Sequence, residues 1–126
     1  MPSEARARRV GERIQEELAI LLIRNVADPR LNMVTITEVD VDRELAYATI
    51  YVTASGGEER EEEVLEGMES ASGYFKSELA TRIQLRAFPQ LRFRWDVVHE
   101  RGQRIEELLD SLKTEGGQPE GEASEE

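Results

Sequence analysis

The chain has 126 residues, no cysteine, a single histidine and a formal net charge of −11 at pH 7. This length allows one domain with a hydrophobic core, while the composition excludes disulfides and thiolate metal sites and gives no reason to expect a metal or a cofactor. No apolar run approaches the roughly 18 residues of a membrane span and no signal-peptide core follows the start, so we expect a cytoplasmic protein without membrane contact.

The acidic residues are concentrated in two segments of the chain. Residues 114–126 hold five acids and no base, and residues 58–69 hold seven acids and one arginine. Elsewhere acids and bases are equal in number, and nearly all of the bases are arginines, which suit bidentate phosphate contact. The total charge opposes binding to nucleic acid, whereas a local cluster of arginines still allows it.

Residues 4–25 have the apolar spacing of an amphipathic helix. One stripe along this helix contains Val10, Ile14, Leu18 and Leu21. A basic row beside the stripe contains Arg6, Arg9 and Arg13. Asp28-Pro29 ends the segment, because the residue before a proline avoids helical geometry. We therefore expect one flank of the helix to pack and the adjacent flank to carry positive charge.

Two strands are predicted next. Residues 33–41 and 45–53 are rich in β-branched side chains, and residues 42–44 between them are typical of a hairpin turn. Apolar and polar side chains alternate along the second strand, with Tyr47, Thr49 and Tyr51 on the polar side. In the first strand the apolar face changes between Ile36 and Val39, which predicts a β-bulge.

A glycine interrupts the helical region that follows the flexible loop at residues 54–57. Helical apolar spacing leads up to Met68, and it resumes from Phe75 to Ile83. Glycine inside a helix costs about 0.5–1 kcal/mol relative to alanine, so an uninterrupted helix would not favour it here. The segment Ala71-Ser72-Gly73 therefore predicts a bend between two helices of about three turns each.

Residues 91–96 alternate as a third strand, with Phe93 and Trp95 toward the core and Arg92 and Arg94 toward water or a partner. Residues 101–112 have the spacing of a final helix. From residue 113 onward glycine, proline and glutamate dominate, with too little apolar surface to offset the entropy of ordering. We expect a domain at residues 1–112 and an acidic, disordered tail at residues 113–126.

The predicted order of elements is helix, strand, strand, helix, bend, helix, strand, with a terminal helix added. Helices must cover the apolar face of the three-stranded sheet, which gives an α+β two-layer sandwich. This order resembles the type II topology of the KH domain, an RNA-binding module whose GXXG loop holds nucleotide backbone between two helices. Ala71-Ser72-Gly73 occupies the place of that loop but is one residue shorter, which favours a kink over a nucleotide clamp.

Four motifs in colinear order resemble the ribosome-binding factor A family. They are residues 9–18 (RVGERIQEEL), residues 28–31 (DPRL), residues 71–73 (ASG) and residues 101–109 (RGQRIEELL). The resemblance covers residues 4–112. It implies a KH-like, non-enzymatic assembly factor that binds the free 30S subunit near the 5′ end of 16S rRNA, late in maturation, and assists 5′-end processing and growth in the cold.

The partners implied by this resemblance are the 30S subunit, its 16S rRNA and small-subunit ribosomal proteins, with the chain itself a monomer. The alternative is an adaptor in which the KH-like fold is only a scaffold and the acidic segments attract basic proteins without direct RNA contact. A small hydrolase is disfavoured, because no nucleophile, base and orienting group occur in a recognisable set.

The candidate RNA contacts are the basic side chains beside the kink and on the exposed flanks, together with one serine hydroxyl. They are Arg6, Arg9, Arg13, Ser72, Lys76, Arg82, Arg86, Arg92 and Arg94. We expect them to gather into one surface. The alternative for the arginines of the first helix is a solvated face that pairs with Glu12, Glu16 or Glu17, and for Arg82 it is a surface ion pair with Glu78. Ala71, Ser72 and Gly73 are expected to shape the bend.

Two further groups of residues receive structural interpretations. Trp95, Phe93 and Phe88 match the apolar register of the third strand and its lead-in, so we expect core packing and not base stacking. His99 lacks a neighbouring nucleophile and is read as a surface loop residue. The acidic run at residues 58–63 is read as a solvated helix start, favoured by the positive end of the helix dipole.

Overall fold

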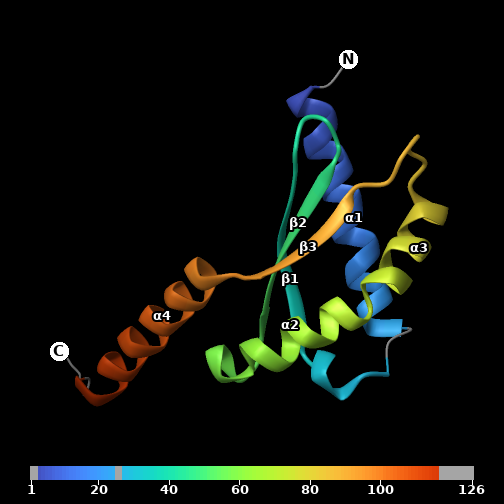
Figure 1. Cartoon of the computed structure of the whole chain (residues 1–126). Helices are drawn as coiled ribbons and strands as arrows, with labels where there is room; N and C mark the ends of the chain where they lie inside the picture. The colour runs from blue at the N-terminus through green and yellow to red at the C-terminus, as the bar shows by residue number, and fades with distance from the viewer. Residues whose placement is uncertain (1–2, 25–26, 117–126) are drawn as a thin grey trace. The chain divides into compact units, whose positions relative to one another are not determined.

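The computed structural model describes residues 3–24 and 27–116, and its element order is the one that the sequence predicts. In chain order the elements are α1 (Glu4–Arg24), the 3₁₀ turn η1 (Pro29–Leu31), β1 (Val34–Val41), β2 (Tyr47–Ala54), the 3₁₀ turn η2 (Gly57–Arg60), α2 (Glu61–Ser70), α3 (Ser72–Arg82), β3 (Gln90–Trp95) and α4 (Val97–Gly116). Figure 1 shows α1, α2 and α3 beside the sheet. The expected α+β class is confirmed.

The sheet is mixed, with the strand order β1-β2-β3. β1 and β2 pair in antiparallel fashion because a short hairpin joins them, whereas β3 returns through the two-helix crossover and runs parallel to β2. The register of β1 shifts between Ile36 and Glu38, which confirms the predicted bulge. The shift returns Val39 and Val41 to the side of the sheet on which Ile36 lies.

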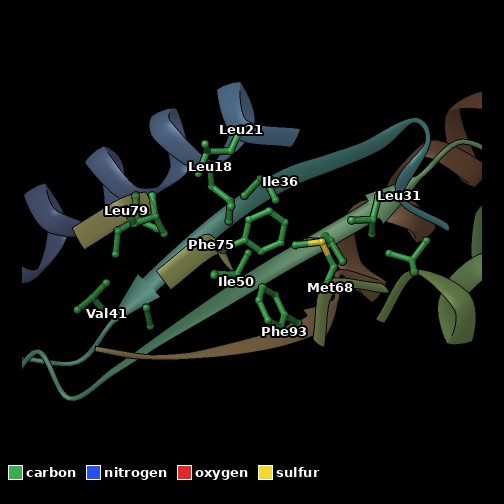
Figure 2. Close-up of a cluster of buried hydrophobic side chains, with 14 of the residues drawn as sticks. Leu18, Leu21, Leu31, Ile36, Val41, Ile50, Met68, Phe75, Leu79 and Phe93 are labelled. Carbon is green, nitrogen blue, oxygen red and sulfur yellow. The ribbon is translucent and has the colours of Figure 1, made fainter. Parts of the chain in front are cut away.

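The core lies between one face of the sheet and the three helices (Figure 2). Every strand contributes alternate residues to it, as Ile36, Ile50 and Phe93 illustrate, and Phe75 of α3 is fully buried among them. Phe93 and Trp95 are buried and Phe88 is partly buried against the core, so the predicted packing role of these aromatics is confirmed. The opposite face of the sheet keeps the polar side chains.

Gly11 brings α1 into close contact with β1. A Cβ atom at this position would lie 2.8 Å from the carbonyl oxygen of Val39, which is backbone and cannot rotate away. The Gly11→Ala variant is therefore expected to lose a net 1 kcal/mol or so, because overpacking of about 1–3 kcal/mol outweighs the gain of about 0.5–1 kcal/mol in helix propensity. Urea unfolding of the variant measures this. An unchanged or raised midpoint would contradict the close contact.

α4 belongs to a second compact unit that begins at Val97, and we describe it by itself. The helix starts four residues before the predicted residue 101, so His99 is exposed on a helix and the expectation of a loop there is wrong. Val97 and Val98 are β-branched, which favours an extended backbone and disfavours a helix start here. Exposed apolar side chains along α4 are Ile105, Leu108, Leu109 and Leu112. Of the predicted tail, residues 117–126 lie outside the described residues.

Among residues 3–24 and 27–116, no helix has both the length and the hydrophobicity needed to cross a membrane. The same ranges contain no cluster of three or more side chains that could hold a metal ion.

Candidate nucleic-acid interface

The arginine row of α1 is exposed along the side of the helix that does not pack on the sheet. Ser3 caps the helix, because its Oγ accepts a hydrogen bond from the backbone N–H of Arg6 at 3.1 Å. Arg6 and Arg9 are exposed, and neither forms an ion pair with another described residue. Their guanidinium groups are therefore available to a partner.

Arg13 and Arg82, by contrast, meet at the crossing of α1 and α3. Arg13 Nη2 donates to the backbone carbonyl of Arg82 at 3.1 Å, which satisfies one of the open carbonyls at the end of α3. Glu17 lies between the two guanidinium groups, 3.7 Å from Arg13 and 3.3 Å from Arg82, and Glu78 binds Arg82 at 2.9 Å. The hydrogen bond with Glu78 is the main cause that raises the pKa of Arg82.

This pairing changes the role of both arginines. The four side chains of the cluster carry two positive and two negative charges, so a phosphate would have to compete with the carboxylates for the same donors. Arg13 and Arg82 thus join α1 to α3. The ion pairs of the alternative interpretation, Arg13 with Glu17 and Arg82 with Glu78, are both present. Lys76 is half-buried on α3, and Arg86 is exposed after the end of that helix.

The helix break lies at Ala71, the single residue between α2 and α3. Its backbone angles, φ −91° and ψ 2°, depart from the helix, yet its N–H still donates to the carbonyl of Gly67 and its carbonyl accepts from Phe75. Ser72 and Gly73 form the first turn of α3, which receives no side-chain cap. The two helices therefore share one connecting residue, with no room for a nucleotide-clamping loop.

Gly73 has no internal requirement for glycine. Its φ is not positive, so its backbone conformation is open to any residue type. A Cβ atom built on it would meet nothing within 4 Å. Its backbone is exposed. Neither backbone geometry nor packing within the described part of the chain accounts for this residue type.

The loop before β1 is held rigidly against α2. The Asp28 carboxylate accepts hydrogen bonds from the backbone and the guanidinium of Arg30, and this guanidinium lowers the pKa of Asp28. Arg60 donates to the carbonyls of Arg30, Asn32 and Ser55, which ties the loop to the start of α2. The DPRL motif therefore has a structural explanation.

Arg92 and Arg94 lie on the other layer of the molecule. They alternate with buried Phe93 and Trp95, so both are exposed on the face of the sheet opposite α1, α2 and α3. The Arg92 guanidinium lies over the ring of Tyr47 at 3.9 Å from the centroid. The expectation of one basic surface is therefore wrong: the predicted residues divide between the helix layer and the open sheet face, because β3 alternates sides at every residue.

Two residues of the open face were not among the predicted contacts. Tyr47 and Tyr51 lie on β2, next to the arginines of β3 in the parallel register. Their alternation with buried residues is visible in the sequence. Their proximity to Arg92 and Arg94 follows only from the pairing of β2 with β3, which no local pattern specifies.

A mixed three-stranded sheet, helices on one face and an interrupted helix pair in the crossover define a KH-like α+β module, a class that includes many RNA-binding domains. Within that class, the model of the family described as ribosome-binding factor A matches residues 6–109. The chain belongs to the ribosome-binding factor A family.

Similar proteins agree with this assignment. A ribosome-binding factor A from Nitrosomonas europaea is 44% identical over 106 residues, which cover 84% of this chain and 91% of that protein. The solution structure of a Thermotoga maritima protein has a TM-score of 0.63 at 29% identity, covering 75% of this chain and 90% of that one. A homology model of Thermus thermophilus ribosome-binding factor A, fitted into a cryo-EM map of a 30S complex, has a TM-score of 0.51 at 27% identity. The match covers 68% of this chain and 86% of that one.

Proposed function

We propose that the chain binds the free small ribosomal subunit through its 16S rRNA, late in the maturation of the subunit. There it assists processing of the 5′ end and growth in the cold. It acts by binding and not by catalysis, as a cytoplasmic monomer, with small-subunit ribosomal proteins as further partners. Membership of the family carries this proposal, because a member of similar fold was fitted into the map of a 30S complex.

The exposed arginines supply the chemistry that such binding requires. Arg6 and Arg9 present guanidinium groups on α1 that form no ion pair with a residue the structure describes, and Lys76 and Arg86 add positive charge on α3 and after its end. The interrupted helix pair at residues 71–73 exposes backbone one turn before Lys76, and the Ser72 hydroxyl is a further donor for phosphate. Arg13 and Arg82 are assigned to positioning α1 against α3, with phosphate contact secondary.

A role in maturation requires a difference in affinity between two states of the subunit, because equal binding to both would shift neither. The test is sedimentation of the purified chain through sucrose gradients with free small subunits, large subunits and complete ribosomes. We expect co-migration with free small subunits alone, weakened steeply by added salt. Equal migration with complete ribosomes, or none with small subunits, would refute the proposal.

Ribonuclease treatment distinguishes the adaptor hypothesis from binding through rRNA. If RNA provides the contact, digestion of the small subunit before capture on the immobilised chain removes its proteins from the bound fraction. Proteins that stay bound to the chain after digestion would favour an adaptor that uses the acidic run at residues 58–63.

Gly73 offers a prediction that separates folding from binding. With open space around its Cβ position, Gly73→Ala is expected to stabilise the free protein by about 0.5–1 kcal/mol, in contrast to the same change at Gly11. If rRNA backbone approaches this turn closely, the added methyl group weakens binding to small subunits in the same variant. Thermal unfolding and gradient co-migration measure the two effects, and a variant with full binding would exclude a close approach at Gly73.

A further inference from the structure

The open face of the sheet carries a group of planar side chains that the helix-layer contacts do not use. We call Tyr47, Tyr51, Arg92 and Arg94 the Tyr–Arg platform. Parallel pairing places Tyr51 opposite Arg94, and it places Arg92 two pairs along from Tyr47, which is the next position on the same face of the sheet. The Arg92 guanidinium lies over the Tyr47 ring at 3.9 Å from the centroid. Tyr47 is 45% exposed and both arginines are exposed.

The charges of the platform remain available to a ligand. Neither Arg92 nor Arg94 forms an ion pair with any residue that the structure describes, and Arg94 makes one hydrogen bond, from Nη1 to the carbonyl of its neighbour Phe93 at 2.9 Å. A guanidinium that lies over a tyrosine ring on one side can accept a second planar group on its other side. The side chains are thus arranged for stacking.

The chemistry of the face indicates which class of partner fits it. No aliphatic side chain is exposed among the outward-facing residues of β2 and β3, so the face lacks the apolar anchors typical of protein-binding hot spots. Aromatic rings and guanidinium planes are the surfaces on which unpaired bases stack, and cations beside them attract the connecting phosphates.

We propose that the Tyr–Arg platform binds single-stranded RNA. An unpaired base stacks on the Tyr47–Arg92 pair, and an adjacent phosphate contacts Arg94. This inference rests on the proposed function only in taking RNA as the partner, and it adds a second contact on the layer opposite α1 and α3.

The acidic side chains of β1 set the path of the RNA strand. Glu38 pairs with Tyr51 and Asp40 with Thr49 in the sheet register, so β1 lines the other side of β2 with negative charge. This charge repels phosphates and confines the strand to the β2–β3 half of the face. Asp40→Asn should therefore tighten binding, the opposite of what a loss of function predicts.

The experiment is a fluorescence anisotropy titration of the full chain with labelled oligoadenylate and oligouridylate of about eight nucleotides, and with an RNA duplex. We expect oligoadenylate to bind most tightly, because purines stack more strongly. Tyr47→Ala and Arg92→Ala should each weaken its binding about tenfold. Tyr47→Phe keeps the ring and should keep the affinity.

Two matched variants separate stacking from charge and from folding. Arg92→Lys keeps the positive charge without the planar group, so it should lose the preference for oligoadenylate over oligouridylate. Arg24→Ala removes an exposed arginine from the end of α1 and should change binding less than about twofold. If Tyr47→Ala and Arg92→Ala fold and bind oligoadenylate like the parent chain, or if Arg92→Lys keeps the full preference, the platform is refuted.

The experiments give different results if this proposal fails and if the proposed function fails. Platform variants that bind oligoadenylate normally, in a chain that still co-migrates with small subunits, would refute the platform alone. A chain that stacks oligoadenylate through Tyr47 and Arg92 but never co-migrates with small subunits would refute the ribosomal role alone.

Discussion

Phe75→Ala is expected to lower the free energy of unfolding by about 3–5 kcal/mol. The ring is fully buried on α3, meets Phe93 edge-on at a centroid distance of 6.5 Å, and lies near Ile50 and Met68 in Figure 2. Residues from the helix and from the sheet surround it, so the cavity left by truncation cannot collapse without moving one layer. Urea denaturation monitored by circular dichroism measures the loss.

The control for this effect is Ile23→Ala, which removes an aliphatic side chain that is 84% exposed at the end of α1. Its unfolding free energy should stay within about 0.5 kcal/mol of the parent value, because little apolar surface leaves a packed environment. A loss at Phe75 no larger than that at Ile23 would contradict the layered core.

The double variant Arg6→Glu with Arg9→Glu should weaken binding to free small subunits on the order of 100-fold at physiological salt. Both side chains are exposed without a described ion pair, so the exchange removes two phosphate donors and adds two repulsive charges while leaving the contact of Arg13 with α3 in place. The slope of log affinity against log salt should become shallower by about 2. Filter binding over a salt series measures both quantities.

Its matched control is Arg24→Glu, which reverses one charge on the same helix beyond the basic row. The control should bind small subunits within about threefold of the parent chain, because a charge about a Debye length or more from the contact is largely screened. Equal losses in the two variants would show that net charge, and not the row on α1, governs binding.

The helices, the strands and the bulge could be predicted because each depends on neighbours in the sequence. The period of Val10, Ile14 and Leu18 specifies the buried side of α1, and the change of face after Ile36 specifies the bulge. Errors occurred where local signals were ambiguous. Val97 and Val98 are residue types typical of strands, yet the structure shows that both belong to the first turn of α4.

The candidate site could be predicted only in part. Exposed arginines can be identified from periodicity, and so can the ion pair of Arg13 with Glu17 one turn along α1. The contacts of Arg82 with Glu17 and with Arg13 depend on α1 crossing α3, because Arg82 is far from both in the sequence. Likewise, Arg60 appeared as a lone base in an acidic run. The structure shows it donating to three backbone carbonyls of two loops.

The amino-acid sequence by itself determined the order of the elements, the buried faces of α1 and of the three strands, and the family, because all of these are encoded in local spacing and in colinear motifs. Only the tertiary structure decided which arginines remain free, that Gly73 has open space around it, and that Tyr47 lies beneath Arg92. Such pairings depend on strand order and helix crossing, which the packing of the whole core selects and no single segment specifies.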